Sequence, residues 1–431
     1  MKLHGNMSIR NNTLYIGGVS CTELVNKYST PLYVFDEGLI RENCRKYNKY
    51  FKVEENKNKV AYAGKAFLTL YMCKIIKEEN LCLDVVSGGE LYTAHKAGFP
   101  MENVLFHGNN KTIDEINMGI ELGVGRFVVD NFYELDIIED ICKKRNKVQE
   151  IYFRITPGIE AHTHDYIKTG QIDSKFGFVL INGDLYEAIE KLYKYKNIKL
   201  VGLHAHIGSQ IFDIEPYMDE VDIMMDLVKE IKIKYNIDLK EIDLGGGIGV
   251  YYTKEDNPKS IQDFCEAIIK RAEQKCKKIG IKVPKLIIEP GRSISANAGS
   301  TLYTIGSIKD IKDVRTYVSV DGGMTDNIRP SLYKAGYECS VVNKMKYEKV
   351  NKVTVAGKCC ESGDILITHA NVMDIESGDI LITTSTGAYG YSMASNYNKI
   401  PKPAVVMVSN GNHRLICKRQ NYEEVINLEL I

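Results

Sequence analysis

Short apolar runs alternate with helix-length segments eight times between residues 59 and 291, and this rhythm constrains the fold more than any other feature. Repeated strand–helix alternation is typical of α/β folds with a parallel sheet. Eight repeats favour a closed (β/α)₈ barrel, for which about 250 residues are usual. The expected strands are residues 60–63, 81–86, 104–106, 127–129, 151–155, 200–207, 242–244 and 286–288.

Helix-start signals lie in phase with these strands. Ser87 to Glu90 and Thr112 to Glu115 fit the capping box that opens a helix, and Asn131 to Glu134 is a close variant. Each follows an expected strand or its loop. Two capping boxes in phase with the expected strands support the barrel more strongly than one capping box alone.

After about residue 299 the pattern changes to strands without long helices, separated by Gly and Asp turns. Asn410-Gly411 between two apolar runs predicts a hairpin with a type I′ turn. We therefore expect an all-β domain, sandwich-like or barrel-like, over residues 299–431, with the barrel over 36–298 and N-terminal strands from 1–35 joining the β domain. The expected β-domain strands are residues 14–16, 32–35, 302–308, 316–320, 353–355, 365–367, 380–382, 405–408 and 414–417.

Composition excludes several classes of partner. Lys plus Arg and Asp plus Glu both number 56, and a zero net charge argues against nucleic acid or an anionic membrane. We expect no transmembrane helix, because no run of 18 apolar residues occurs, and no signal peptide, because the N-terminus lacks an apolar core. The 11 cysteines are scattered without a CxxC pair, which favours reduced thiols and a cytoplasmic protein.

Polar residues and glycines gather where the expected strands end, and in a parallel barrel the chemistry lies at those ends. A pure scaffold would need no such collection. The residues at the eight ends are Lys65, Ser87, His107, Asp130, Arg154, His206, Gly245 to Gly247 and Glu289.

Lys65 and the two histidines of the sixth strand each allow two interpretations. Lys65 is either a solvated surface lysine or a buried amine with a lowered pKa that forms a Schiff base. His204 and His206 face one side of their strand, so they could form an HxH metal pair. The later strand ends supply no further histidine, so we expect no metal. Instead, His204 fits a core histidine, and His206, before Gly208, fits a ring stacked on a flat cofactor.

Gly245 to Gly247 and the segment Glu289-Pro290-Gly291-Arg292 complete the pattern. The glycine run is not a G-x-G-x-x-G or a P-loop, and a tight turn would explain it alone. Glycine turns at two neighbouring strand ends plus an arginine, however, are the usual form of a barrel phosphate site. With Lys65, His206 and Glu289 they suggest pyridoxal 5′-phosphate as the cofactor.

Over essentially its whole length, the chain resembles the fold-type III pyridoxal-phosphate-dependent decarboxylases. Within residues 161–177, Ala161 to Ile167, Thr169-Gly170 and Asp173 to Gly177 resemble the branch that acts on diaminopimelate, and ornithine decarboxylases are not expected to carry this stretch. The general motifs are Tyr62 to Ala66, Val86 to Leu91, His107 to Lys111, Leu203 to Gln210, Gly245 to Gly247, Glu289 to Arg292, Asp326 to Pro330, Cys360 to Ser362 and Gly387 to Tyr389.

The resemblance implies decarboxylation of meso-2,6-diaminopimelate to L-lysine and CO₂, the last step of lysine biosynthesis. It implies that Lys65, Cys360, His206 and Glu289 are catalytic. The cofactor-binding set would be Lys65, His206, Ser209, Gly247, Glu289, Pro290, Gly291, Arg292 and Tyr389. The substrate-binding set would be Arg292, Arg329, Tyr333, Glu361 and Tyr389.

Elementary chemistry agrees with these roles. A carboxylate beside the pyridine nitrogen keeps that nitrogen protonated, which suits decarboxylation, whereas the related racemases place an arginine there. Two arginines can bind a second carboxylate through paired hydrogen bonds, and Glu361 would accept from an ammonium. Cys360, the expected proton donor or its positioner, would otherwise be read as a small buried side chain. If Cys360 and Glu361 come from a neighbouring subunit, the enzyme is a homodimer with shared sites.

Two rival functions remain at this point, ahead of a metal-dependent hydrolase, which ranks last. One is a decarboxylase of the same fold acting on ornithine, arginine or carboxynorspermidine, against which residues 161–177 and the pair Arg329 and Glu361 argue. The other is a non-catalytic homologue that regulates a partner, which should have lost Lys65 or Cys360. One departure from the family is the run Lys399 to Pro403, where arginines are more usual.

Overall fold

The computed structural model describes residues 1–51, 58–158 and 174–431, and its chain divides into two compact units. Unit 1 comprises residues 1–42, 250–257 and 292–431, and unit 2 comprises residues 43–249 and 258–291. The predicted stretch from Ala161 to Asp173 lies outside the described residues. No helix in the described part of the chain is both long and apolar enough to span a membrane.

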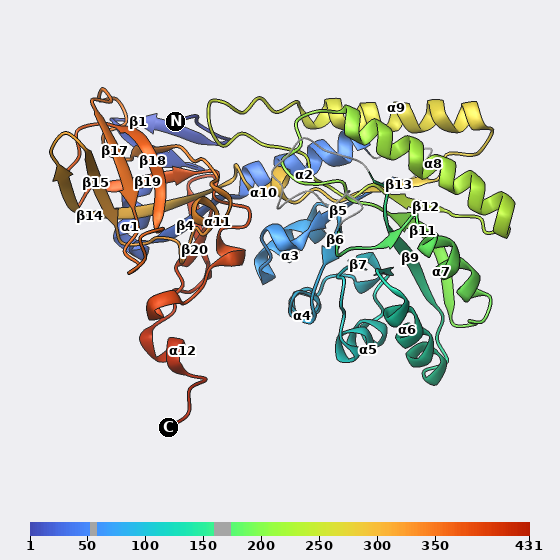
Figure 1. Ribbon diagram of the computed structural model, residues 1–431. Coiled ribbons are helices and arrows are strands. Elements are labelled where there is room, and N and C mark those ends of the chain that lie inside the picture. Colours follow the sequence, from blue (N-terminus) through green and yellow to red (C-terminus); the bar gives the residue numbers. More distant parts are fainter. Residues whose placement is uncertain (52–57, 159–173) are drawn as a thin grey trace. The chain divides into compact units, whose positions relative to one another are not determined.

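Unit 2 is the predicted barrel of eight parallel strands surrounded by helices (Figure 1). The eighth strand pairs with the first, so the sheet closes. A short extra strand, β10 (Phe178–Val179), pairs with β9. The barrel strands are β5 (Lys59–Ala63), β6 (Cys82–Val85), β7 (Val104–Phe106), β8 (Arg126–Val129), β9 (Gln149–Thr156), β11 (Ile198–His204), β12 (Glu241–Asp243) and β13 (Lys285–Ile288).

The barrel interior is filled rather than hollow. Seven strands each contribute one buried residue to a single cluster, because alternate residues of a strand point to the same side. This packing fixes the strand ends that carry the polar residues. The cluster contains Ala61, Cys82, Leu105, Val128, Tyr152, Val201 and Ile287.

The barrel helices begin largely as predicted. Thr112 and Glu115 form a complete capping box at α5, whereas at α4 Ser87 accepts from the Glu90 amide but the Glu90 side chain accepts from Val86 instead. Helix α2 (Glu37–Phe51) contains the boundary between the units. The remaining helices are α3 (Leu70–Glu78), α4 (Gly88–Lys96), α5 (Ile113–Leu122), α6 (Phe132–Lys144), α7 (Asp184–Leu192), α8 (Glu215–Tyr235) and α9 (Ile261–Ile279), with 3₁₀ turns η1 (Gly64–Ala66) and η2 (Met101–Asn103).

Unit 1 is predominantly β, as predicted. Its large sheet runs β18-β17-β15-β14-β4-β20-β21, and β19 pairs with both β14 and β16. The strands are β4 (Leu32–Asp36), β14 (Gly299–Ile311), β15 (Arg315–Val320), β16 (Cys339–Val341), β17 (Asn351–Ala356), β18 (Ile365–Val372), β19 (Ile380–Thr384), β20 (Ala404–Ser409) and β21 (Asn412–Cys417). The helical elements are α1 (Cys21–Tyr28), α10 (Arg292–Ser295), α11 (Arg329–Tyr333), α12 (Tyr422–Ile426), η4 (Tyr391–Met393) and η5 (Tyr397–Lys399).

The two N-terminal strand segments behave differently. β4 enters the large sheet between β14 and β20, as predicted. Residues 14–16 instead form a separate small sheet of β1 (Met7–Arg10), β2 (Thr13–Ile16) and β3 (Val19–Ser20). Leu14 and Ile16 still pack in one core with residues of the large sheet, so burial rather than strand pairing attaches them. At the predicted hairpin, Asn410 and Gly411 both have positive φ, as a type I′ turn requires.

Candidate active site

The carboxyl-terminal ends of the barrel strands enclose a cavity of about 320 Å³ within unit 2. Three of the predicted site residues, Lys65, His206 and Glu289, line it together. The full lining is Lys65, Val86, His107, Gly108, Asn109, Arg154, Phe176, His204, His206 and Glu289.

Glu289 is held by two histidines at this end of the barrel. The Nε2 atom of His107 lies 2.7 Å from Oε1 of Glu289, and the Nε2 atom of His204 lies 3.2 Å from Oε2. All three side chains are almost fully buried. Asp84 continues the chain of contacts, since its Oδ1 atom is 3.7 Å from Nε2 of His107. The carboxylate is therefore fixed in place by two different strand ends.

The charges of this cluster follow from its burial. Burial opposes ionisation of Glu289, yet His107 and His204 hold its pKa well below the usual range, so it is a carboxylate. Burial lowers the pKa of His204 to about 3 despite the charge of Glu289, so its ring is neutral and donates its Nε2 hydrogen. Burial, and then the charge of Glu289, raises the pKa of the neighbouring Asp243 well above its usual value.

His204 lies with His107 and Glu289 in a group that could hold a metal ion, and His206 is not part of that group. The ligand atoms of His107, His204 and Glu289 lie within 4.8 Å of one another, but both imidazoles of this group already contact the carboxylate. His206 instead accepts a hydrogen bond at Nδ1 from the Gly246 amide, at 3.2 Å. Strand β11 ends at His204, three residues before the predicted end. His206 therefore belongs to the loop beyond the strand.

His206 is a neutral ring. Burial lowers its pKa well below the usual value, and the positive charges of Lys65 and Arg154 lower it further. With its Nδ1 atom accepting, the ring carries its hydrogen on Nε2. A neutral imidazole of this kind can lie against a flat cationic heterocycle without charge repulsion.

The prediction that a functional Lys65 would be buried is wrong. Lys65 lies on η1, directly after β5, and its side chain is exposed where it lines the cavity. Access to an incoming carbonyl therefore does not require rearrangement of the barrel.

The glycine run after β12 is tightly enclosed. Gly245 and Gly247 have φ values of 61° and 108°, which favour glycine. A Cβ atom at Gly246 would lie 2.2 Å from the Glu289 carbonyl oxygen, and one at Gly247 would lie 2.3 Å from that of Gly208. The loop thus packs against two neighbouring segments, and Tyr217 on α8 donates a hydrogen bond to the Gly246 carbonyl, at 3.0 Å.

The segment from Glu289 to Gly291 packs against the start of the barrel. The Pro290 carbonyl accepts from the Ala63 amide, at 3.2 Å, and a Cβ at Gly291 would lie 2.9 Å from that of Ala63. Backbone packs so closely at both glycine turns that neither has room for a side chain, and glycine turns of this kind at neighbouring strand ends suit a phosphate. Ser209, also predicted to contact the cofactor, is half-buried on the same loop as His206.

Unit 1 holds a second cluster of predicted residues. Arg292 on α10 and Arg329 on α11 are both buried. The Arg292 guanidinium lies 4.8 Å from the ring centroid of Tyr389, whose φ is 60°. Tyr333 closes α11 and is half-buried. Two guanidinium groups in one compact region form a strongly cationic site that suits an anion.

Cys360 and Glu361 are exposed on the loop between β17 and β18. The alternative interpretation of Cys360 as a small buried side chain is therefore wrong. The Cys360 amide donates to Oδ1 of Asn398, at 2.8 Å, and the adjoining Lys399, at the start of the run that departs from the family, pairs with Glu429. The other ten cysteines are also free thiols, in agreement with the predicted reduced state.

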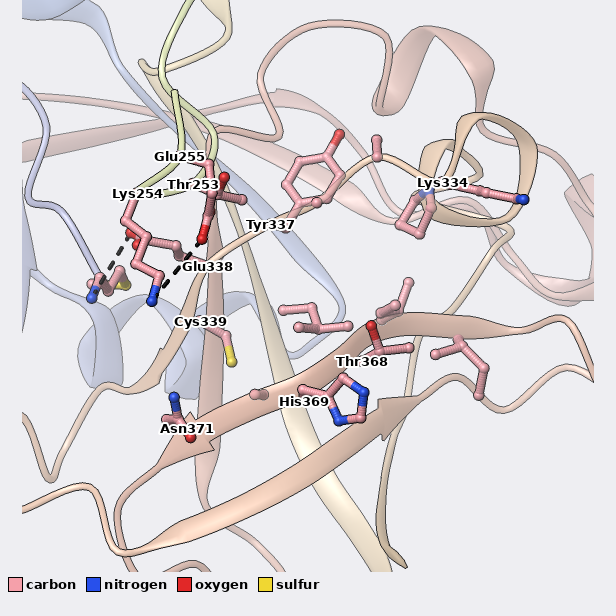
Figure 2. A pocket seen from close by; sticks show the side chains of 18 of the residues that line it. Thr253, Lys254, Glu255, Lys334, Tyr337, Glu338, Cys339, Thr368, His369 and Asn371 are labelled. Atoms are coloured by element: carbon pink, nitrogen blue, oxygen red, sulfur yellow. Dashed lines mark ion pairs between the residues drawn. The ribbon is translucent and has the colours of Figure 1, made fainter. Parts of the chain in front are cut away.

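A larger cavity, of about 800 Å³, lies within unit 1 (Figure 2). It is lined by α11, the loop after it and strand β18. Figure 2 shows Tyr337 on one side of this cavity and Thr368 and His369 of β18 on the other. Glu338 also contributes, and its Oε2 atom lies 3.8 Å from the amino group of Met1.

Sequence reasoning assigned no role to four residues that the structure places in these clusters. His107 was recognised only as a strand end within a family motif, and Arg154 only as a strand end. Tyr252 and Tyr337 were not recognised at all, although both are buried against the arginines of unit 1. Tyr252 follows the glycine run, and its position there was the one available signal.

Comparison with known proteins supports the cofactor assignment. Residues 37–296 match the family model of the pyridoxal-dependent decarboxylase pyridoxal-binding domain. Over all 431 residues the chain is 48% identical to the diaminopimelate decarboxylase of Bacillus subtilis, covering 98% of that protein, and over 97% of its length it is 43% identical to that of Staphylococcus aureus, covering 97% of that enzyme. It is also similar to the diaminopimelate decarboxylase of M. jannaschii in complex with L-lysine, with a TM-score of 0.92, 35% identity, and 99% and 98% of the two chains covered.

Proposed function

This chain belongs to the diaminopimelate decarboxylase branch of the pyridoxal-dependent decarboxylases, and we propose that it converts meso-2,6-diaminopimelate to L-lysine and CO₂. This reaction completes lysine biosynthesis. One observation carries the proposal: a buried carboxylate, Glu289, is held by two imidazoles in the same cavity that Lys65 and His206 line.

The cavity suits pyridoxal 5′-phosphate. The cofactor needs an amine for its aldehyde, a neutral surface for its ring, a carboxylate for its ring nitrogen and a concave backbone for its phosphate. Lys65, His206, Glu289 and the turns at Gly247 and Gly291 offer these features, and Ser209 and Pro290 lie in the same loops. When bound, the cofactor supplies a covalent link to an amine and an acceptor for the electrons that departing CO₂ leaves behind.

The barrel residues have separate tasks in this reaction. Lys65 provides the amine that holds the cofactor and yields to the substrate amine. Glu289, ionised and fixed by His107 and His204, keeps a proton on the ring nitrogen by opposite-charge stabilisation. His206 supports the ring face and stays neutral, so it does not repel a protonated ring.

The residues of unit 1 determine which substrate the enzyme accepts. Arg292 and Arg329 bind the distal carboxylate of diaminopimelate with Tyr333, Glu361 accepts from the distal ammonium, and Tyr389 and Arg292 also serve the cofactor phosphate. Ornithine has no second carboxylate and would leave two buried guanidinium groups without their anion, which is costly. This asymmetry favours diaminopimelate over the diamine-forming substrates of related decarboxylases.

Cys360 gives or positions the proton that replaces CO₂, and it acts together with Glu361 in the site of a second subunit. The exposure of both residues supports a homodimer with shared sites. We further propose a cytoplasmic enzyme in which residues 36–298 carry the cofactor and residues 299–431, with 1–35, form the β domain. All eleven cysteines being free is consistent with that compartment.

Complementation tests this function. A lysine-requiring bacterium that lacks its own decarboxylase should grow without lysine when it carries this chain, and the Lys65→Ala variant should not support growth. Failure of the wild-type chain, at a protein level equal to that of a complementing relative, would contradict the proposal.

A further inference from the structure

Arg292 and Arg329 are held by two tyrosines that no sequence motif indicated. Nη1 of Arg292 donates to the Tyr252 hydroxyl at 2.5 Å, and Nη1 of Arg329 donates to the Tyr337 hydroxyl at 2.6 Å. All four side chains are less than 10% exposed, at 6% and 7% for the arginines and 6% and 5% for the tyrosines. Each guanidinium therefore has a fixed phenolic partner within unit 1.

Tyr252 bridges the two arginines. The Arg329 guanidinium lies 5.0 Å from the centroid of the Tyr252 ring, and that of Arg292 lies 5.7 Å from it. Burial alone would raise the pKa of the Tyr252 phenol, but the charges of Arg292 and then Arg329 lower it below its usual value. The hydroxyl oxygen is thus the electron-rich group between two cations.

Tyr337 fixes the arrangement from the other side. Its ring meets that of Tyr252 edge-on, with centroids 5.4 Å apart and an interplanar angle of 86°. The same ring lines the large cavity of unit 1, and its hydroxyl points away from Thr368 and His369 (Figure 2). Tyr337 therefore forms a wall with the cavity on one face and Arg329 at its hydroxyl end.

Two buried guanidinium groups repel each other, and their side chains have many rotamers. The phenols counter both effects, since each accepts a hydrogen bond and offers the negative face of a ring. Among the described residues no carboxylate lies within ion-pair distance of Arg329. An added carboxylate would therefore meet donors that are already oriented, and would supply the full negative charge that the phenols lack.

We propose that Tyr252 and Tyr337 are positioning residues that hold Arg292 and Arg329 in the spacing needed to bind the carboxylate at the distal end of the substrate. This proposal rests on the proposed function and names a determinant of its specificity. The tyrosines act through the arginines. Their loss should weaken ligands that carry the distal carboxylate and spare ligands that lack it.

L-Lysine and cadaverine separate these two cases. Decarboxylation removes the carboxylate at the reacting end, so L-lysine keeps the distal carboxylate, and cadaverine is the same diamine without it. Dissociation constants for both would be measured by titrating the pyridoxal-phosphate-loaded enzyme and following the cofactor absorbance. The cadaverine-to-lysine ratio of these constants then reports the distal carboxylate alone.

Tyr252→Phe keeps the ring and removes only the bridging oxygen. We expect it to lower the ratio by about 10-fold, the value of one hydrogen bond to a charged group, and to raise KM for diaminopimelate with a much smaller change in kcat. Tyr337→Phe should lower the ratio in the same direction. Tyr317→Phe is the matched control, because Arg315 donates to Tyr317 in the same way through an exposed hydrogen bond on strand β15, and it should leave the ratio unchanged.

An unchanged ratio in Tyr252→Phe and Tyr337→Phe would overturn the proposal, as would an equal loss for both ligands. If one variant does not fold, the other decides. The titration measures binding and needs no turnover. A wild-type enzyme that binds lysine through its carboxylate but releases no CO₂ would contradict the proposed function. The role of the tyrosines could still be measured with that enzyme.

Discussion

The Nε2 atom of His107 lies 2.7 Å from Oε1 of Glu289, so the carboxylate after the last barrel strand is tied to the residue that follows the third. His204 holds the other carboxylate oxygen at 3.2 Å. A carboxylate with both oxygens engaged cannot rotate freely. Its charge and direction are therefore set before any cofactor arrives, which is the pre-organisation that electrostatic catalysis requires.

Replacing His107 should weaken this arrangement. His107→Gln removes the imidazole that lies 2.7 Å from Glu289, and loss of a polar contact with a buried charged group is worth about 1.5–3 kcal/mol. We expect kcat to fall about 10-fold or more and pyridoxal-phosphate affinity to fall as well. Steady-state kinetics and cofactor titration measure these changes, and His95→Gln, at an exposed histidine of α4, is the control. Normal kinetics in His107→Gln would contradict the role.

A substitution in the glycine turn after β12 tests whether this turn binds the phosphate of the cofactor or its ring. Gly247 has a φ of 108°, and a Cβ there would lie 2.3 Å from the Gly208 carbonyl. Gly247→Ala should shift the loop and weaken pyridoxal phosphate much more than pyridoxal, which has no phosphate. Equilibrium titration with both compounds tests this. Gly89→Ala, on α4, would bring a Cβ no closer than 3.8 Å to the Ser87 hydroxyl and should change neither affinity. Equal weakening of both compounds in Gly247→Ala would count against a phosphate site.

The contacts of Glu241 predict how the free energy of unfolding depends on pH. Its carboxylate accepts from Arg126 at 2.9 Å, from Lys285 at 2.6 Å and from Tyr152 at 2.5 Å. Although burial opposes this, these partners lower the pKa of Glu241 from 4.5 to about 2. A lowered carboxyl pKa stabilises the fold above the unfolded value and loses that contribution as the pH falls through the folded value. Glu241→Gln should therefore cost about 3 kcal/mol at neutral pH.

Urea unfolding of wild type and Glu241→Gln over a range of pH measures this effect. The difference between their midpoints should be full above about pH 5 and should shrink toward pH 2. Glu121→Gln removes an exposed ion pair with Arg145 and should cost less than about 1 kcal/mol at every pH. A difference between the two midpoints that grows on acidification would contradict the predicted direction of the pH dependence.

Shared active sites predict recovery of activity on mixing. Lys65→Ala and Cys360→Ala should each be nearly inactive as homodimers. In a mixed dimer one of the two sites would contain both native residues, so random exchange of subunits should restore about a quarter of wild-type activity. No recovery after verified subunit exchange would mean that each chain builds its own site.

The parts of the fold that repeat were predictable from sequence. Each barrel strand ends near a polar residue or a glycine, and the alternation with helices gives both the strand count and the end that carries chemistry. Residues 14–16 were harder, since an apolar strand pattern does not reveal its pairing partner. Their small sheet joins the core through Leu14, Ile16 and Val19, with Met7 and Ile9 packed against it.

The missed residues share one property: their role depends on a partner far away in sequence. His107 is separated from Glu289 by 182 positions in the chain, which is the difference between their residue numbers, and nothing local marks it as a contact of that carboxylate. Tyr252 resembles an ordinary loop aromatic until Arg292 and Arg329 are seen on its hydroxyl and ring. Lys65 likewise lines a cavity that only the folded barrel creates.

The most direct test is CO₂ release by the purified, pyridoxal-phosphate-loaded enzyme given meso-2,6-diaminopimelate, with ornithine, arginine and carboxynorspermidine in parallel. We predict release from diaminopimelate with L-lysine formed in equal amount, and release from the other three lower by at least about 100-fold, since they offer no matching carboxylate to the two buried guanidinium groups. Release from ornithine or arginine but not from diaminopimelate would contradict it.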